Sequence, residues 1–168
     1  MELRAQLLQA HSKENCNYIV AWVGNNQARF DELFALFMGN ESRLVQMSSW
    51  PLSYCVEAYP NLLQKHFASL LKNIKRQHNH DAVKRHTLRM LKFAEIPKKY
   101  QGEVMNMCFD FTQNISEKPT TKIFSLIVLE NLAKFYPEII DELRLILETQ
   151  IQHESAGFKS RAKKMLSK

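Results

Sequence analysis

The stretch Asp81–Pro97, DAVKRHTLRMLKFAEIP, contains the clearest copy of a unit that recurs along the chain. In this copy an apolar residue and a lysine, Val83 and Lys84, are followed by a small residue, Thr87, and by Leu91. The first apolar position recurs at residues 45, 83, 121 and 158, at intervals of 38, 38 and 37 residues. Repetition at this period is typical of solenoids built from helical hairpins. We therefore predict an all-α fold, a right-handed α-α superhelix (solenoid) of about five helical hairpins.

The other copies keep this template with substitutions. The lysine position is occupied in chain order by Gln46, Lys84, Lys122 and Lys159, and the small position by Ser49, Thr87, Ser125 and Ala162. The leucine position is occupied by Ser53, Leu91, Leu129 and Leu166. The first copy is the weakest, with Ser53 at the leucine position.

Apolar residues spaced by three and four predict helices over 2–10, 13–24, 27–38 and 41–59. Ser12 and Asn26 precede the second and third of these helices and are expected to be their N-caps. Gly24 fits the left-handed position that ends the second helix. Pro51 lies inside the fourth helical pattern, so we expect a kink or break after Trp50.

Three later hairpins begin near a proline: Pro60, Pro97 and Pro137 are 37 and 40 residues apart. A shared apolar stripe follows each proline, namely Leu63, Phe67, Leu70 and Ile74, then Tyr100, Val104, Met107 and Phe111, then Ile140, Leu143, Leu147 and Ile151. Polar segments at 76–81, 114–119 and 152–157 are expected to be the turns inside these hairpins. The pattern predicts ten helices in one domain, 1–168, with an atypical N-terminal capping pair, 1–26, and repeats over 27–168.

Composition agrees with a helical protein that has no membrane-spanning segment. The 168 residues are 45% apolar and 24% charged, with four glycines and five prolines, too few for a turn-rich β-protein. There is no apolar run of about 18 residues and no recognisable secretory signal at the start of the sequence. The three cysteines are scattered, which favours buried, reduced thiols and predicts a cytoplasmic protein.

The recurring unit resembles the second helix of HEAT and armadillo-type repeats, and the build is also similar to that of uncharacterised bacterial HEAT-like proteins. The resemblance covers about residues 27–168 and implies a non-enzymatic interaction scaffold. That family commonly has an aspartate five residues before the apolar position, where this chain has Asn40, His78, Ser116 and His153. We therefore expect no ladder of aspartate and arginine side chains between the repeats.

Catalytic and metal-binding motifs are weakly represented. His78, His80 and Asp81 form a His-x-His-Asp cluster, but it lies in a helix–helix turn and has no further histidine ligand close by. The interpretation favoured here is a solvent-exposed turn with Asp81 as N-cap. The sequence contains no Gly-rich phosphate loop, no G-x-S-x-G and no H-E-x-x-H. We predict no cofactor, no metal site and no enzymatic activity.

Charge is distributed unevenly. The net charge is +6, with nine basic and two acidic residues over 72–99, but four basic and nine acidic residues over 100–158. Stacked repeats would align the basic template positions along the second helices. The candidate binding residues are therefore Lys84, Arg85, Arg89, Lys92, Lys122 and Lys159. The alternative is a solvated helix face whose lysine stems cover apolar surface.

We predict that this concave, partly basic face binds an acidic protein or peptide. The alternative is nucleic-acid binding, because the build also resembles HEAT-like DNA alkylation-repair glycosylases. Those enzymes rely on aromatic and acidic side chains of the concave face. Trp50 lies on a second helix, but no aspartate matches the acidic position, and aromatic residues at helical spacing are more often part of a core.

Overall fold

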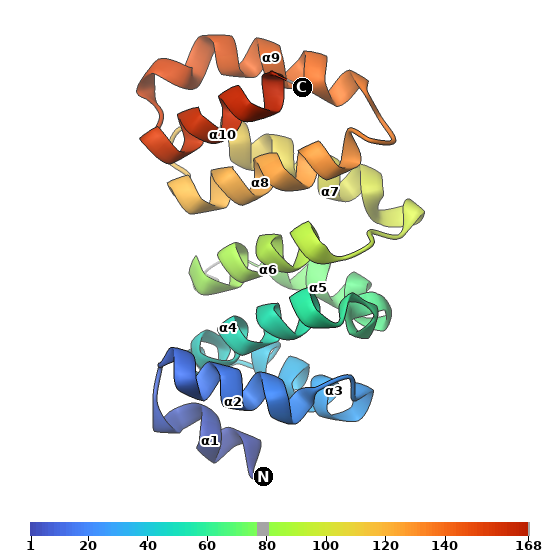
Figure 1. Ribbon diagram of the computed structural model, residues 1–168, viewed down its shortest axis with the longest axis vertical. Helices are drawn as coiled ribbons and strands as arrows, with labels where there is room; N and C mark the ends of the chain where they lie inside the picture. The colour runs from blue at the N-terminus through green and yellow to red at the C-terminus, as the bar shows by residue number, and fades with distance from the viewer. Residues whose placement is uncertain (77–80, 168) are drawn as a thin grey trace. The chain divides into compact units, whose positions relative to one another are not determined.

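The computed structural model describes residues 1–76 and 81–167, which contain ten α-helices and no strand (Figure 1). Its contacts divide the chain into two compact units, Met1–Glu95 and Ile96–Lys168. The all-α helical-repeat fold is confirmed, and the organisation as a single domain stays a prediction. None of the helices in the described part of the chain is long and apolar enough to span a bilayer.

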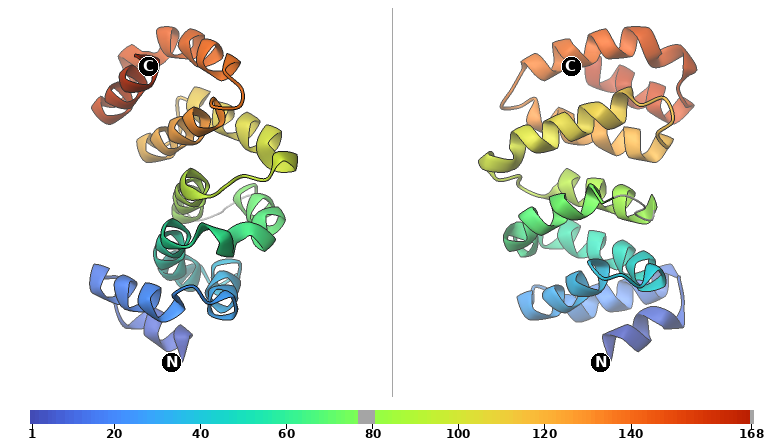
Figure 2. Two further views of the ribbon diagram at one scale, coloured as in Figure 1. Left: turned by 45° about the vertical axis from the view of Figure 1, so that its right-hand side comes forward. Right: turned by 180° about the vertical axis from the view of Figure 1, so that it is seen from behind.

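The N-terminal unit contains six α-helices and one 3-10 helix. They are α1 Leu3–Gln9, α2 Lys13–Val23, α3 Gln27–Phe37, α4 Ser42–Ala58, the 3-10 helix Pro60–His66, α5 Phe67–Ile74 and α6 Asp81–Phe93. The second helices of the hairpins, α2, α4 and α6, form one layer, and α3 and α5 form the layer behind it (Figures 1 and 2). Helix α4 packs against α2, α3 and α6 and is the centre of this unit.

The predicted caps of α2 and α3 are confirmed. Ser12 Oγ accepts a hydrogen bond from Asn15 N, and Asn26 Oδ1 accepts one from Arg29 N. Gly24 follows α2 with φ of 50°, a left-handed conformation that side chains with a Cβ rarely adopt. Its N–H donates to Val20 O as the last hydrogen bond of α2, so the predicted end of the helix at this glycine is confirmed.

Of the kink or break expected after Trp50, the break is wrong, because α4 continues through Pro51 as one helix. An interior proline costs about 3 kcal/mol, since it removes a backbone hydrogen bond and crowds the preceding turn. Ten residues of α4 are buried, among them Pro51 itself and residues on both sides of it. Burial over the whole length of the helix offsets the local cost.

The C-terminal unit contains four α-helices: α7 Lys98–Gln113, α8 Pro119–Leu132, α9 Glu138–Gln150 and α10 Ala156–Leu166, with a 3-10 turn at Ile151–His153. Helix α8 packs against α7 and α10. Pro60 is the first residue of the 3-10 helix, and Pro97 and Pro137 lie immediately before α7 and α9, so the predicted proline boundaries are confirmed. Four of the predicted stripe residues are partly exposed and not in the core: Tyr100, Phe111, Ile140 and Ile151.

The template predicted from the sequence describes the interior of both units. Its small positions, Ser49, Thr87, Ser125 and Ala162, are 0% exposed. A small residue there lets the second helix of each hairpin approach its neighbours closely, because a longer side chain would hold them apart. The first apolar positions, Val45, Val83, Thr121 and Phe158, are also buried.

Candidate functional site

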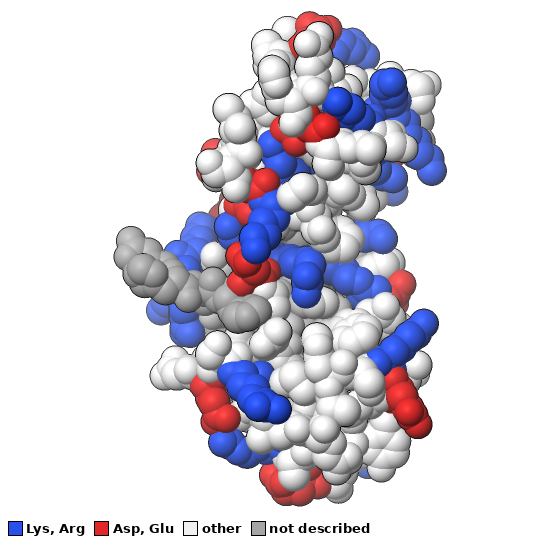
Figure 3. All heavy atoms as spheres, turned by 90° about the vertical axis from the view of Figure 1, so that its left-hand side faces the viewer, with Lys and Arg blue, Asp and Glu red and all other residues white. Residues whose placement is uncertain are grey.

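The six predicted binding residues lie on three different helices. Lys84, Arg85, Arg89 and Lys92 are on α6 in the N-terminal unit, whereas Lys122 is on α8 and Lys159 on α10 in the C-terminal unit. Figure 3 shows lysine and arginine side chains interspersed with acidic ones on the face that it presents. Local ion pairs therefore decide which positive charges are available to a partner.

Lys122 is a correction to the predicted basic face. Its side chain is buried, its ammonium pairs with the Glu154 carboxylate, and its Nζ lies 5.4 Å from the centroid of the Phe158 ring. A lysine in this position holds two helices together and presents no charge to the solvent. Lys159 is partly exposed, and its Nζ donates to Gln152 O at 2.9 Å, which closes the turn before α10.

The basic residues of α6 differ in exposure. Arg85 is exposed, whereas Lys84, Arg89 and Lys92 are partly buried. Lys92 Nζ lies 4.5 Å from the centroid of the neighbouring Phe93 ring, as expected of a long side chain that covers apolar surface.

Arg89 is the most closely held of these side chains. Its guanidinium lies 4.1 Å from the centroid of the Tyr54 ring and 5.2 Å from that of Phe93. One guanidinium nitrogen donates to Ser53 Oγ at 3.3 Å, and the other pairs with the Glu57 carboxylate. Three residues of α4 and one of α6 thus fix the guanidinium at the surface between the two helices.

Aromatic side chains extend this cluster along α4. Trp50 and Tyr54, one turn apart, have ring centroids 6.3 Å apart in an edge-to-face arrangement. His11, from the turn between α1 and α2, meets Trp50 in the same way at 5.3 Å. Trp50 is partly exposed and is not the core residue that its spacing indicated. We call the surface formed by His11, Trp50, Tyr54, Glu57, Arg85 and Arg89 the α4–α6 face.

A hydrogen-bond chain under this face fixes the tautomer of His86. Arg85 approaches His86 Nε2 at 3.4 Å, and because a guanidinium can only donate, Nε2 carries the lone pair. The proton of the neutral ring is then on Nδ1, which donates to Ser53 Oγ at 3.1 Å. The Ser53 hydroxyl in turn donates to Trp50 O at 2.8 Å.

The electrostatics of this chain are consistent with a neutral imidazole. Burial, followed by the positive charges of Arg85, Arg89 and His11, lowers the pKa of His86 to about 3. A neutral His86 that donates to Ser53 does not take its proton, so the pair is arranged as a structural support and not as a nucleophile with its base.

The cysteines are also in environments that disfavour reaction. All three are free and buried, as predicted, and burial raises the pKa of Cys16 to about 11 and of Cys55 and Cys108 to about 12. Nucleophilic cysteines have lowered pKa values. The described residues contain no group of three potential metal ligands, and His78 and His80 lie outside the described residues.

A hollow continues the α4–α6 face towards the start of α4. It has a volume of about 690 Å³ and is lined by Leu8, Gln9, Ala10, His11, Ser42, Arg43, Gln46 and Met47. His11 borders both the hollow and the Trp50 ring. The hollow and the aromatic residues therefore form one surface along α4.

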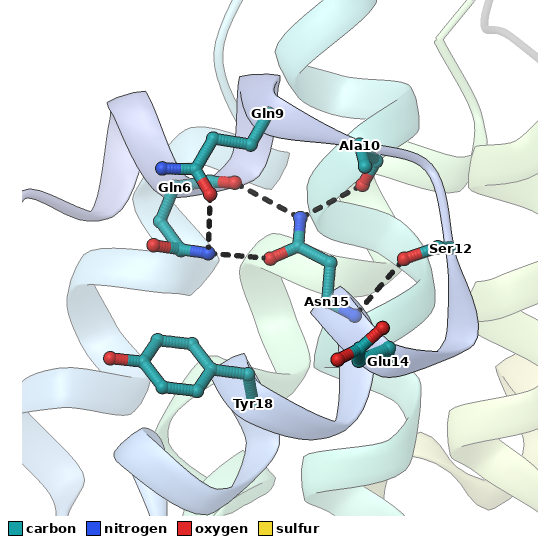
Figure 4. Close-up of a pocket in the computed structure, with 7 residues that line it drawn as sticks. All are labelled: Gln6, Gln9, Ala10, Ser12, Glu14, Asn15 and Tyr18. Carbon is teal, nitrogen blue, oxygen red and sulfur yellow. Dashed lines mark hydrogen bonds between the residues drawn. The ribbon is translucent and has the colours of Figure 1, made fainter.

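A second hollow, of about 310 Å³, lies between α1 and α2 (Figure 4). Its polar groups are bonded to one another: Asn15 Nδ2 donates to Gln6 O and Ala10 O, and Gln6 Nε2 donates to Asn15 Oδ1. These bonds join α1 to α2. We assign Asn15 the structural role of holding the N-terminal pair together.

Sequence reasoning missed Tyr54, Glu57 and the pair of Ser53 and His86. The signal that could have found them is the polar Ser53 at a leucine position of the template. Its hydroxyl oxygen accepts from both His86 and Arg89, so the substitution marks the place where polar contacts replace apolar packing between α4 and α6.

Comparison with known proteins identifies the repeats of the chain but gives no information about the α4–α6 face. No curated protein and no solved structure matched the chain. A family model described as a HEAT repeat domain matches residues 3–168. That match covers nearly the whole sequence and both units, and the chain therefore belongs to the HEAT repeat family.

Proposed function

We propose that this protein is a non-enzymatic scaffold that binds an acidic protein or peptide segment on its α4–α6 face. HEAT repeats are generally protein-interaction scaffolds, which supports the general class of function. Arg85 and Arg89 are proposed as the central contacts, flanked on α6 by Lys84 and Lys92. Lys122 is omitted because it is buried in an ion pair.

The observation that carries the proposal is the contact of the Arg89 guanidinium with the Tyr54 ring, next to Trp50 on the same helix. Tryptophan, tyrosine and arginine contribute most of the binding energy in many protein interfaces. Here their side chains are partly buried and already ordered by contacts within the unit. Binding would therefore cost little additional side-chain entropy.

The length of α4 indicates how long a bound peptide segment the α4–α6 face could hold. At 17 residues the helix is about 25 Å long. An extended peptide of about seven residues covers the same distance. The hollow bordered by His11 would then accept side chains at one end of the segment.

Nucleic-acid binding is the alternative, favoured by the aromatic and basic side chains on one face. One feature of the face supports a protein ligand instead. The Tyr54 ring is already covered by Arg89, so it is not available for stacking on a base.

The test compares binding of a fluorescein-labelled peptide of alternating glutamate and glycine with binding of a labelled duplex DNA, by fluorescence anisotropy. We expect the peptide to bind at about 150 mM salt and Trp50→Ala to weaken it. Trp22→Ala is the matched control, because Trp22 is also partly exposed and contacts an arginine, Arg29, with 5.1 Å between guanidinium and ring. It should leave binding unchanged.

Preferential DNA binding would overturn the proposal. Four phosphate contacts from α6 would give a slope of about −3.6 in a plot of log affinity against log salt. Capture of partners from a native lysate, with and without nuclease, gives a second readout: a protein partner should survive nuclease treatment and be lost on Arg85→Glu.

A further inference from the structure

Glu57 and Arg89 form an ion pair between α4 and α6 whose two members are unequally exposed. The Arg89 side chain is 15% exposed, whereas that of Glu57 is 40% exposed. The carboxylate is therefore the outer member of the pair, on the side from which a ligand approaches.

The guanidinium does not depend on Glu57 for its position. Tyr54 and Phe93 lie against it at 4.1 and 5.2 Å, and Ser53 accepts one of its hydrogen bonds. If the Glu57 side chain turned away, Arg89 would keep these contacts and expose a positive charge. The Glu57 side chain is 40% exposed, so water can solvate its carboxylate when it separates from Arg89.

Arg85 lies one helical turn before Arg89 and differs from it in exposure and in its partners. It is exposed, it approaches His86 Nε2, and no carboxylate of the described residues pairs with it. The two arginines thus offer one unpaired and one internally paired guanidinium on the same face. Burial lowers the pKa of His86, and the positive charges of Arg85, Arg89 and His11 lower it further. This second contribution agrees with a positive potential beneath the surface.

We propose that Arg85 and Arg89 form a two-point carboxylate-binding site, in which Glu57 is an internal stand-in for an acidic side chain of the bound segment. The first ligand carboxylate pairs with Arg85, and the second displaces Glu57 from Arg89. This inference rests on the proposed function, since it names the side chains that the α4–α6 face would recognise.

The spacing of the arginines specifies the ligand further. Arg89 is four positions after Arg85 on α6, an axial distance of about 6 Å. Alternate residues of an extended chain are about 6.7 Å apart and point to the same side. A segment with Glu-x-Glu or Asp-x-Asp therefore presents two carboxylates at about the axial spacing of the two arginine positions on α6. A segment with a single acidic residue would pair with Arg85 and leave Glu57 in place.

The test is a set of charge-neutralising variants titrated with the labelled Glu-Gly peptide and with its Gln-Gly counterpart. Glu57→Gln should tighten binding of the Glu-Gly peptide by about fivefold, as expected when a competing charge is removed from a water-exposed pair. Glu32→Gln is the matched control, because Glu32 is exposed on α3, in the other layer of the same unit. It should change binding less than twofold.

A double variant separates displacement at Arg89 from a general change of charge. In the Arg89→Gln background the gain from Glu57→Gln should disappear, whereas in the Arg85→Gln background it should persist. Circular dichroism and thermal melting establish that each variant is folded. If Arg89→Gln does not fold, Arg89→Lys replaces it, and the gain should shrink because a lysine lacks the planar, two-donor group.

The outcomes distinguish this inference from the proposed function. Binding of the peptide to the wild type, with no gain or a loss in Glu57→Gln, would overturn the stand-in role while the binding face remains. A gain that persists in the Arg89 variant would also overturn it, because general electrostatics would then explain the change. Failure of every variant to bind the peptide, with DNA bound instead, would overturn both proposals.

Discussion

The Lys122 ammonium on α8 pairs with the carboxylate of Glu154, which lies two residues before α10, inside the C-terminal unit. The Lys122 side chain is 2% exposed and that of Glu154 is 11% exposed. Phe158, the first apolar position of the last repeat, lies against the same ammonium. Lys122 was expected to present its charge to a partner, but its side chain instead connects α8 with the start of α10.

Neutralising Glu154 should destabilise the protein strongly. Glu154→Gln leaves the Lys122 charge buried without a counter-ion, which typically costs about 3–5 kcal/mol of unfolding free energy. Lys122→Met combined with Glu154→Gln should recover a large part of this loss, because the pair is replaced by groups that need no desolvation. Urea unfolding followed by circular dichroism measures both variants. Glu148→Gln, at an exposed position of α9, should change the unfolding free energy by less than about 0.5 kcal/mol.

The apolar stripe after Pro60 can be tested at Phe67, which is 1% exposed. Phe67→Ala should lower the unfolding free energy by about 3–5 kcal/mol, because it removes a large buried ring and leaves a cavity. Phe135→Ala is the matched control: Phe135 is 70% exposed and should contribute little. A loss below about 1 kcal/mol at Phe67 would contradict its role as a core residue.

Much of the fold was predictable because the repeat period and the helix signals are local. The buried small positions Ser49, Thr87, Ser125 and Ala162 follow from the template alone. The HEAT-type resemblance is confirmed by the family match over residues 3–168. The uninterrupted α4 was not predictable in this way, because packing against three other helices outweighs the local effect of Pro51.

The site was less predictable, because its charges are decided by partners that are distant in sequence. Lys84 and Lys122 occupy the same template position, yet only Lys122 is buried, through a glutamate 32 residues later. Arg89 likewise pairs with Glu57, 32 residues earlier. A repeat template gives the position of a side chain on its helix but not which acidic residue of the adjacent hairpin reaches it.

The lowered pKa of Asp31 predicts how the free energy of unfolding changes at acidic pH. Partial burial alone would raise the pKa of this carboxyl, but hydrogen bonds from Lys65, Gln27 and His66 outweigh burial and lower the pKa from 3.8 to about 2. Between about pH 4 and pH 2 the unfolded chain therefore binds a proton that the folded protein does not. Asp31→Asn should cost about 1–2 kcal/mol at pH 7, and its difference from the wild type should shrink as the pH falls through this range. Urea unfolding at a series of pH values measures the difference.

His86 should influence stability at higher pH than Asp31 does. In the unfolded chain its pKa is near 6.5, whereas in the folded protein it is lowered to about 3. From about pH 6.5 down to pH 3, the unfolded chain therefore takes up a proton that the buried ring does not. Each pH unit in this range lowers the unfolding free energy by up to about 1.4 kcal/mol. His86→Gln, which keeps a donor for Ser53, should remove this contribution to the pH dependence and leave the part due to Asp31.

The same residue gives a spectroscopic test of the hydrogen-bond chain under the α4–α6 face. Because Arg85 can only donate to Nε2, the neutral ring should carry its proton on Nδ1. Nitrogen-15 chemical shifts of the imidazole distinguish this tautomer from the Nε2-protonated one. The shifts should not change between pH 7 and about pH 5, because the pKa of about 3 keeps the ring neutral there. A ring protonated on Nε2 would mean that Ser53 donates to His86 and that the support for Arg89 is arranged differently, whereas a ring that titrates near pH 6.5 would mean that His86 is not shielded from water.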